Sequence, residues 1–460
     1  MKINLGKSVA AVAALTFGVT LALRIRGISD HFWLLGDQIR DWSIVLGSFS
    51  ELPLVGSPTH FGGYTIGPAF YWILWVIRVT VGSWFENLPH AGGIGQAMLQ
   101  SGGDALLLVA IWRRSGSPWI ALSTVVLVAT SAYDLALSAL VWNPTMGAML
   151  AKVAMALVLL NWHRGSTVRV AVTVAVAWSS VHAYTGAIFV AVSVFAAILA
   201  EPLALRDWRG ARRAGAVTVV IVVLLQVPYM VHRLSGRFVD LAMGSVSDSV
   251  GQILSGSAQP AIANSVTGYV NAAQFIGIQP WRLPFVGWAL VVCAGIVTVR
   301  YRRDPSLLAM TVLPQFAAVA GYALFLGDLD HYYYLSLMPA IMLMVVLAAT
   351  TVPPPRFARP AVVVLLVAAL ALAPGKIRFA ATMHQMPEYR LLVDGSRRIM
   401  STGQSIQAIE TEFALPPTTD TSFLYTILGG QVDPESLWVA LITADGRVVY
   451  RTIGDRGEGL

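Results

Sequence analysis

The dominant pattern along the chain is a series of long apolar segments separated by polar connections. A helix needs about 20 apolar residues to cross a bilayer, and about eleven segments approach that length. They lie at 8–25, 96–112, 119–134, 146–161, 168–183, 185–202, 214–231, 282–299, 306–326, 334–350 and 360–374. The segments lack the period-two alternation of a membrane β-barrel, so their backbone groups must be satisfied within helices. The pattern predicts an all-α polytopic membrane protein.

Two apolar stretches do not fit a simple series of single spans. Residues 66–84 are apolar, but a full crossing here would conflict with the distribution of basic residues between the two sides. We expect a partly inserted helix that belongs to the first outer loop, with a twelfth span as the alternative. Residues 168–202 are too long for one helix, and we divide them at His182-Ala183-Tyr184-Thr185-Gly186. The division gives two helices that meet at the outer face.

Composition and charge support the membrane assignment and orient it. The chain is 56% hydrophobic and 12% charged, whereas soluble domains contain about 25% charged residues. The net charge of +7 comes from arginines at the ends of apolar segments, so it indicates orientation in a membrane and does not predict a nucleic-acid partner. Basic clusters lie at 113–114, 163–164, 206–213, 300–303 and 356–359. All five are predicted to be cytoplasmic, because cytoplasmic loops are enriched in Lys and Arg.

The N-terminal segment resembles a signal peptide, with Lys2 and Lys7 around the start of an apolar run at 9–23. No small-x-small cleavage site precedes Arg24, so we expect an uncleaved first helix and a cytoplasmic N-terminus. The compact size and short loops favour a bacterial inner membrane. The single cysteine, Cys293, lies within an apolar run. It allows neither a disulfide framework nor a thiolate metal cluster, and we expect it to be a packing residue.

Three outer segments divide the chain. They are residues 26–95, residues 233–280 and the tail after residue 375. The middle segment is rich in Ser, Gly, Asn and Gln, which predicts a loop with short interfacial helices. We therefore expect a membrane module at 1–374, with a long first outer loop at 26–95, and a small extracytoplasmic α/β domain at 375–460.

The tail carries its own structural signals. Residues 387–410 predict one or two helices with Gly395 as a possible break, and residues 439–452 predict a β-hairpin. Asp445-Gly446 supplies the turn between the two alternating strands of that hairpin. A unit of about 80 residues is near the lower limit of independent stability, so we expect it to lean on the membrane bundle.

Polar residues gather on the predicted outer face, and such residues near membrane spans mark substrate paths. They are Asp37, Arg40, Asp41, His60, Asp134, Asn143, His182, Asp328, Asp330 and His331. Asp134 and Asp328 also fit ordinary span ends, and His182 also fits a hydrogen-bonded interior histidine. Asp37 is the strongest functional candidate, because Arg40 follows it one helical turn later in an apolar context.

Arg24 and Arg26 lie at the outer end of the first span, where the charge rule disfavours them. Their side chains can reach up to the lipid headgroups. They can also hold the phosphate of a lipid-linked substrate, because arginine binds phosphate through two parallel hydrogen bonds. The sequence leaves both interpretations open.

Several motifs are missing from the sequence: a Walker A loop, a G-x-S-x-G elbow, an H-E-x-x-H pair and a C-x-x-C pair. Nothing therefore supports ATP-driven transport, serine hydrolysis or zinc chemistry of these types.

Four local motifs resemble the GT-C integral-membrane glycosyltransferases, which use polyprenyl-phosphate sugars and include protein O-mannosyltransferases and lipid A aminoarabinose transferases. They are Gly36-Asp37-Gln38-Ile39-Arg40, Gly62-Gly63-Tyr64-Thr65-Ile66-Gly67-Pro68-Ala69-Phe70-Tyr71-Trp72, Trp142-Asn143-Pro144, and His331-Tyr332-Tyr333-Tyr334 followed by Pro339. The many spans, the long first outer loop and the small C-terminal outer domain also resemble this family. The likeness covers most of the chain by architecture and about 40 residues by motif.

The resemblance implies roles for individual residues. Asp37 matches the first-loop aspartate that serves as general base or positions the acceptor, and Arg40 matches an arginine that contacts phosphate. Asp41 stands in for a second carboxylate, because Gln38 replaces the acidic residue that often follows the aspartate. A lysine of the aminoarabinose transferases is replaced by Ile66, and His60 is the candidate substitute. Further substrate-binding candidates are Tyr64, Asp134, Asn143, His182, Tyr184, His331 and Tyr332.

The predicted function is an inverting glycosyltransferase that moves a sugar from a polyprenyl-phosphate donor to a lipid, glycan or protein acceptor at the outer face. Asp37 would take the acceptor proton, and Arg40 would stabilise the leaving phosphate. No cofactor is required; a divalent cation is possible but unsupported. The alternatives are a transporter or flippase, and a polymerase or ligase, for lipid-linked saccharides. A transporter would show a continuous polar path to the inner face, and a purely structural scaffold would not need these outer charges.

Overall fold

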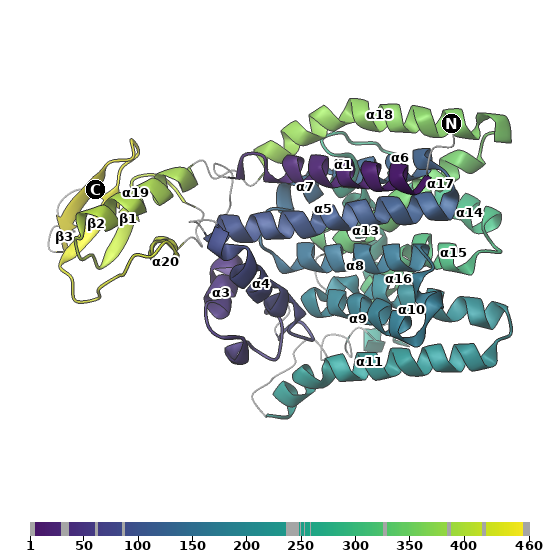
Figure 1. Ribbon diagram of the computed structural model, residues 1–460, viewed down its shortest axis with the longest axis horizontal. Helices are drawn as coiled ribbons and strands as arrows, with labels where there is room; N and C mark the ends of the chain where they lie inside the picture. The colour runs from purple at the N-terminus through teal and green to yellow at the C-terminus, as the bar shows by residue number, and fades with distance from the viewer. Residues whose placement is uncertain are drawn as a thin grey trace.

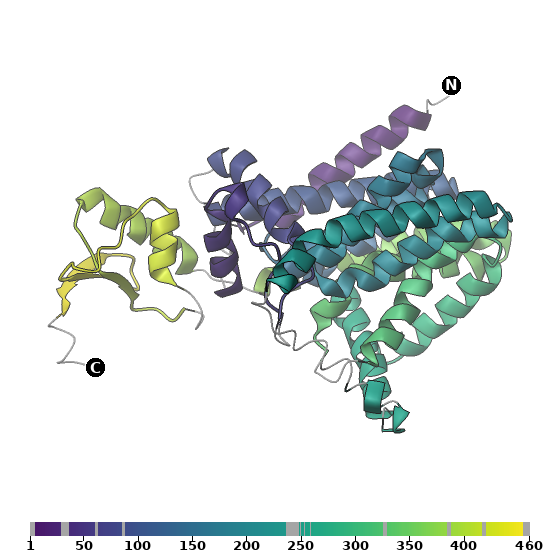
Figure 2. The same cartoon turned by 90° about the horizontal axis from the view of Figure 1, so that it is seen from below.

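The computed structural model describes residues 5–28, 36–59, 63–84, 88–235, 248, 250–252, 254–257, 259–324, 329–383, 388–415 and 420–453. Most of these residues form a bundle of roughly parallel and antiparallel helices, and a small α/β unit lies beyond one end of the bundle (Figure 1). Figure 2 shows the same separation from below. The small unit is the C-terminal part of the chain.

Each predicted span coincides with a helix or with a pair of helices. The helices are α1 (Leu5–Ile25), α5 (Leu88–Ser115), α6 (Pro118–Ala129), α8 (Asn143–Leu159), α9 (Thr167–Ala183), α10 (Ile188–Ala204), α11 (Trp208–Leu234), α14 (Val286–Arg300), α15 (Pro305–Thr311) with α16 (Leu313–Tyr322), α17 (Met338–Thr351) and α18 (Pro355–Thr382). Six helices in the described part of the chain are long and apolar enough to cross a membrane, or seven if α15 and α16 form one span bent by 45°. The predicted polytopic helical membrane fold is confirmed.

The connections between these helices explain several differences from the predicted spans. α6 ends at Ala129, and the short helix α7 (Ala132–Leu137) follows a break at Thr130 and Ser131. The predicted division of 168–202 is confirmed, because the 3-10 turn η4 (Thr185–Ala187) separates α9 from α10. The 3-10 helix η3 (Trp162–Gly165) connects α8 to α9, and η5 (His331–Leu337) leads directly into α17.

Helix α13 (Gln259–Ile278) corrects the prediction of a loop with short interfacial helices at 233–280. It is a helix of 20 residues, and its inward face carries the buried residues Tyr269, Ala272 and Ile276. Ser265 is fully buried and donates a hydrogen bond of 2.7 Å to the carbonyl of Val319. Small and polar residues lower the apolar signal of this helix but suit close packing between helices in a membrane.

The predicted first outer loop is largely ordered. Gly27, at a φ of 71°, follows the end of α1, which is a backbone conformation that glycine adopts without a Cβ clash. Helix α3 (Gly36–Val45), the turn η1 (Phe49–Glu51), helix α4 (Ala69–Thr80) and the turn η2 (Gly82–Trp84) follow. α3 and α4 lie together at the end of the bundle that faces the C-terminal unit (Figure 1). α5 already begins at Leu88, so it takes in the last residues of the predicted loop.

The opposite end of the bundle holds the connections from α10 to α11, from α14 to α15 and from α17 to α18, together with the start of α1 (Figure 1). These connections contain three of the five basic clusters that the charge pattern predicts to be cytoplasmic. The bundle therefore has a basic end and an end that carries α3, α4 and the C-terminal unit. We call the latter the α3 end.

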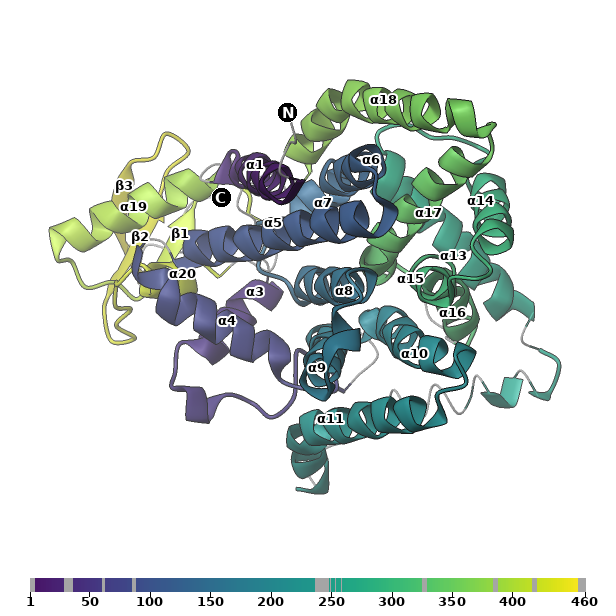
Figure 3. The ribbon, with the colours of Figure 1, turned by 45° about the vertical axis from the view of Figure 1, so that its right-hand side comes forward.

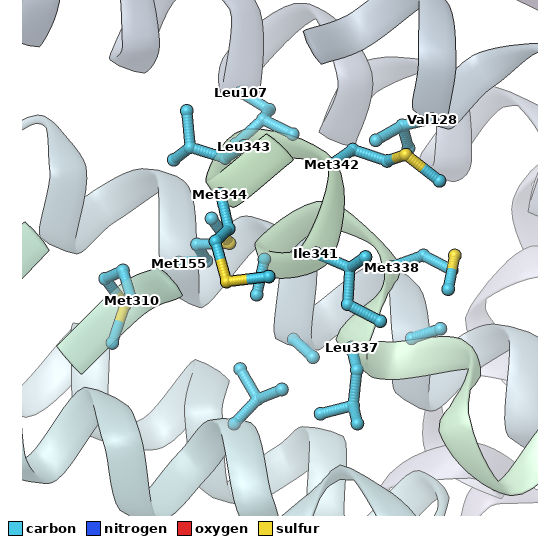
Figure 4. Packing of buried hydrophobic residues seen from close by; sticks show 14 of the residues in the cluster. Leu107, Val128, Met155, Met310, Leu337, Met338, Ile341, Met342, Leu343 and Met344 are labelled. Carbon is cyan, nitrogen blue, oxygen red and sulfur yellow. The ribbon is translucent and has the colours of Figure 1, made fainter. Parts of the chain in front are cut away.

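The core of the bundle is apolar and rich in methionine. Leu107, Met155, Met310, Met338 and Met344 are almost completely buried and pack together where α5, α8, α15 and α17 meet (Figure 4). Unbranched methionine side chains fill irregular gaps. Because lipid chains are as apolar as these residues, tight packing between helices contributes more to the cohesion of such a core than exclusion of water does.

The C-terminal unit contains helix α19 (Glu388–Thr402), strand β1 (Ala408–Thr411), helix α20 (Thr421–Ile427), and strands β2 (Trp438–Ile442) and β3 (Val448–Thr452). The strands form one sheet in the order β1-β2-β3, in which β1 and β2 are parallel and β2 and β3 antiparallel. The predicted hairpin is confirmed, with Gly446 in its turn at a φ of 78°.

Two expectations for this unit are wrong. Gly395 does not break a helix but lies within α19, where a Cβ atom would come 2.5 Å from Ile442 Cδ1. The glycine therefore permits α19 to pack closely on β2. Residues 408–411 are strand and not helix. The unit contacts the bundle through Tyr389, whose ring centroid lies 5.1 Å from that of His90 at the start of α5.

Candidate functional site

Helix α3 places Asp37, Arg40 and Asp41 next to one another. Its buried residues Gln38, Asp41, Trp42 and Val45 follow helical spacing, so this face packs inward. Arg40 Nη1 donates to Asp37 Oδ1 at 2.9 Å, and its Nε and Nη2 donate to Asp41 Oδ1 at 2.9 and 2.8 Å. One guanidinium therefore holds both carboxylates.

Asp41 is the inner carboxylate of this group. It is 0% exposed, and its Oδ1 also accepts a hydrogen bond of 3.0 Å from the Tyr71 hydroxyl on α4. Its Oδ2 is buried without a hydrogen-bond partner among the described residues. Burial raises the pKa of Asp41 to about 6, although Arg40 and Tyr71 act in the opposite direction. Asp41 cannot touch a large acceptor, but it can fix the position of Arg40.

Asp37 is the outer carboxylate. Its side chain is 54% exposed, and that of Arg40 is 32% exposed. A general base must lie within hydrogen-bond reach of the proton that it accepts, and Asp37 meets this requirement where Asp41 does not. α3 therefore presents the accessible carboxylate of Asp37 and the partly accessible guanidinium of Arg40. The buried carboxylate of Asp41 holds that guanidinium from the protein interior.

A group of aromatic residues lies near α3. The ring of Tyr332 lies 4.8 Å from the ring of Trp142 and 6.2 Å from that of Tyr184, measured between centroids. All three rings are partly exposed, as is Asn143 at the start of α8. Trp42 of α3 lies close to Val141, the residue that precedes Trp142. Both side chains adjoin Gly92, where a Cβ atom would lie 2.1 Å from Trp42 and 2.8 Å from Val141. The structure thus brings Trp142, Tyr184 and Tyr332 together, and Asn143 follows Trp142 directly in the chain.

His331 and His182 both contact other side chains of the protein. His331 stacks on Phe275 with a centroid distance of 4.2 Å. His182 is 1% exposed, and its Nε2 lies 3.2 Å from Gln226 Oε1. Gln226 donates in turn to the carbonyl of Ile66 at 2.8 Å. His182 and Gln226 therefore support the loop before α4.

The loop that His182 supports approaches it closely. A Cβ atom at Gly67 would lie 2.1 Å from His182 Nδ1, so no larger residue fits without movement. Tyr64 in this loop is 41% exposed, with its ring 6.0 Å from that of His232 on α11. His60 and Asp328 lie outside the described residues. Tyr64 is thus the accessible candidate of the glycine-rich motif.

A second cluster of charges lies inside the bundle and involves residues that the sequence analysis did not select. Arg24 Nη2 on α1 lies 2.7 Å from Asp104 Oδ2 on α5 and 2.5 Å from Asp134 Oδ2 on α7. Lys152 Nζ on α8 lies 2.6 Å from Asp104 Oδ1. We call these four residues the buried charge network. All four are less than 10% exposed.

The buried charge network answers the question that the sequence left open for Arg24. Its guanidinium also donates to the hydroxyls of Ser138 and Ser101, at 2.9 and 3.1 Å, so it neither reaches the lipid headgroups nor is free to hold phosphate. Asp134, a predicted substrate-binding residue, is engaged with Arg24. A signal existed in the sequence: Asp104 and Lys152 are opposite charges within two predicted spans, where unpaired charges are costly.

Among the described residues, no group of three or more His, Cys, Asp or Glu side chains is placed to hold a metal ion. The paired carboxylates on α3 already share the guanidinium of Arg40. The arrangement can accept a proton at a carboxylate and bind an anion at the guanidinium.

Comparisons with known proteins give matches at the level of structure. No family model and no curated protein sequence matches the chain. A crystal structure of ArnT from Cupriavidus metallidurans bound to undecaprenyl phosphate is similar, with a TM-score of 0.50 at 14% identity over 94% of this chain and 86% of that one. The apo structure of ArnT gives 0.46 at 16% identity, over 93% and 85% of the two chains.

A cryo-EM structure of the mycobacterial arabinofuranosyltransferase AftD gives a TM-score of 0.43 at 16% identity, over 89% of this chain and 30% of that one. The chain thus shares the fold of the undecaprenyl-phosphate-bound ArnT structure over most of both chains. The predicted polytopic helical fold with a small C-terminal α/β unit is thus one that a solved structure shares.

Proposed function

We propose that this protein is a glycosyltransferase that moves a sugar from a polyprenyl-phosphate donor to an acceptor at the outer face of a bacterial inner membrane. The observation that carries the proposal is the exposed Asp37–Arg40 pair on α3, supported by buried Asp41. The fold shared with ArnT bound to undecaprenyl phosphate supports a donor of this class. In this orientation the α3 end and the C-terminal unit are extracytoplasmic, and the N-terminus is cytoplasmic.

The reaction follows from the chemistry of the pair. The acceptor hydroxyl gives its proton to the Asp37 carboxylate while its oxygen bonds to the anomeric carbon. The bond from that carbon to the phosphate oxygen breaks, and the lipid phosphate leaves with the bonding electrons. Direct displacement inverts the anomeric configuration. When Asp37 accepts the proton it loses its charge, so the Arg40 Nη1 group that Asp37 held can bind the leaving phosphate while Asp41 keeps the guanidinium in place.

The aromatic group suits the sugar. Trp142, Tyr184 and Tyr332 present partly exposed rings beside α3, and Asn143 adds an amide that can donate and accept hydrogen bonds. Amphipathic aromatic side chains provide a rigid apolar surface at a low cost in conformational entropy. We assign these four residues to sugar binding, together with Tyr64 from the glycine-rich loop.

The test is donor turnover by the purified full-length protein in nanodiscs, with a panel of polyprenyl-phosphate sugars. We expect Asp37→Asn to lower the rate by roughly 10²- to 10⁴-fold, because a positioned general base contributes about that much. Asp394→Asn is the matched control: Asp394 also lies on an outer helix beside an arginine, with Arg390 Nε 4.0 Å away. Full activity of both Asp37→Asn and Asp37→Ala would disprove the role of Asp37.

One observation favours transport as a second candidate: the buried charge network extends the polar region into the membrane spans. Its four charges cancel in pairs, which is typical of a structural network. If no donor is consumed, but vesicles that contain the protein move a labelled lipid-linked sugar across the bilayer, the transport function replaces the transferase.

A further inference from the structure

A cavity of about 230 Å³ lies beside the C-terminal end of α1. It lies between the end of α1, α7 and the end of α18, and Arg24, Arg26 and Arg378 supply its charged wall. The other lining residues are apolar or glycine: Leu23, Gly27, Ile28, Leu135, Ala136, Ala139, Leu140, Ile377, Ala380, Ala381 and Met383. A water molecule needs only about 15 Å³ of such space, so the cavity admits a larger group.

The charge of this cavity is not balanced by its walls. Among the residues that the structure describes, no acidic side chain lines it. Arg24 is neutralised by Asp104 and Asp134, but Arg26 and Arg378 are exposed and make no ion pair or hydrogen bond with any residue that the structure describes. Two unpaired guanidinium groups on an otherwise apolar cavity attract an anion, and arginine binds phosphate with two parallel hydrogen bonds.

The two helices α1 and α18 that line the cavity carry exposed apolar side chains along their length. On α1, Leu15 and Val19 are 66% and 50% exposed, and on α18, Val364 and Val367 are 67% and 59% exposed. Most of the apolar length of α1 and of α18 is exposed on the surface of the bundle. Figure 3 shows both helices on the outside of the bundle. A molecule whose headgroup enters the cavity can therefore place its hydrocarbon chains along these two helices.

We propose that this cavity binds the phosphate group of a membrane lipid between Arg26 and Arg378, with the lipid chains along α1 and α18. The ligand is defined by this chemistry, a phosphate ester joined to long hydrocarbon chains. A glycerophospholipid and a polyprenyl phosphate both satisfy it. The site is separate from the α3 carboxylates, and its existence does not depend on sugar transfer.

The experiment is native mass spectrometry of the full-length protein released from detergent, with phosphatidylglycerol, undecaprenyl phosphate or phosphate-free diacylglycerol added separately. We expect the wild type to retain at least one of the two phosphate lipids and not diacylglycerol. Arg26→Gln and Arg378→Gln should each weaken retention about five- to tenfold, because an arginine contributes about 1 kcal/mol or more to an anionic headgroup. Arg233→Gln is the matched control, since Arg233 is an exposed arginine at the end of α11.

A second variant tests whether the lipid enters the cavity. Ala139→Leu fills the cavity without changing its charge and should reduce retention as the arginine variants do. Preference for undecaprenyl phosphate would identify the ligand as the carrier lipid, and preference for phosphatidylglycerol would identify a phospholipid. Equal retention by wild type and both arginine variants, equal retention of diacylglycerol, or no effect of Ala139→Leu would each overturn the proposal.

Discussion

Asp37 and Asp41 share the guanidinium of Arg40 but lie in different surroundings, and this difference assigns their roles. Asp37 faces solvent, whereas Asp41 is enclosed by α3 and α4 and hydrogen-bonded to Tyr71. A carboxylate that meets the acceptor must be accessible, and a carboxylate that orients an arginine is better held in place. Within one turn of helix, Asp37 is thus placed to transfer a proton and Asp41 to position Arg40.

The raised pKa of Asp41 makes a prediction about stability. Because burial raises the pKa from 3.8 to about 6, the folded chain binds this proton more tightly than the unfolded chain. The stabilisation is fully present below about pH 4 and is lost as the pH rises through 6. Between pH 4 and pH 7, the free energy of unfolding of the wild type should fall by on the order of 3 kcal/mol relative to that of Asp41→Asn, measured by thermal unfolding in detergent. Parallel pH profiles of the two proteins would contradict this.

Sequence reasoning succeeded at the residue scale where a motif brought neighbours together on one helix. Asp37, Arg40 and Asp41 are separated by a turn or less, so helical spacing places them on one side. It did not separate the exposed carboxylate from the buried one, because burial of Asp41 depends on Tyr71 from α4, which lies 30 positions away. It also missed Lys152 and Asp104, whose pairing depends on which spans become neighbours.

At the scale of helices, the buried charge network joins α1, α5, α7 and α8. Removal of one partner leaves an uncompensated charge among apolar side chains, so Asp104→Leu should destabilise the protein by about 3–5 kcal/mol. The double variant Asp104→Leu with Lys152→Met removes both charges of one pair and leaves Arg24 with Asp134. It should recover at least half of the lost stability in thermal unfolding. Equal destabilisation by the single and double variants would show that the unpaired charge does not cause the loss of stability.

The glycine-rich loop gives a second prediction at this scale. Gly67→Ala would drive a methyl group into His182, and overpacking of this kind costs about 1–3 kcal/mol. Since Tyr64 lies on the same loop, we also expect slower donor turnover. Gly102→Ala is the control: a Cβ atom there meets nothing within 4 Å, so it should be neutral or slightly stabilising. Normal stability of Gly67→Ala would show that the loop adapts.

Helices with a strong apolar pattern were predictable, and α13 was not. The α13 sequence contains Ser265, Gly268, Asn271 and Gln274 among its apolar residues, and it is not among the helices whose length and hydropathy suffice for a membrane span. Its burial becomes evident only when η5 and α16 are packed against it, since Tyr334 and Tyr269 lie 6.1 Å apart there. Hydropathy detects helices whose surfaces suit a lipid environment. It does not detect the face of α13 that packs against other helices.

For the whole molecule, the proposed orientation can be tested by labelling. In a Cys293→Ala background, Ser401→Cys in the C-terminal unit should react with a membrane-impermeant maleimide in spheroplasts. Ser115→Cys, at the basic end of α5, should react only after permeabilisation. Both positions are exposed, so a difference in labelling reports the side of the membrane. The reverse pattern would place the C-terminal unit in the cytoplasm and would remove the outer-face reaction.

The position of Arg24 has a consequence for biosynthesis. It lies on α1, which is synthesised before α5 and α7, and Asp134 follows 110 residues later in the chain. Until α5 and α7 are made, the guanidinium at the outer end of α1 lacks both of its carboxylate partners, and its burial among apolar side chains would leave an uncompensated charge. We therefore expect α1 to insert with Arg24 held at the membrane surface, and to settle into the bundle only after α7 has been synthesised. α1 would then enter the membrane before α5 and α7 but reach its final position after them.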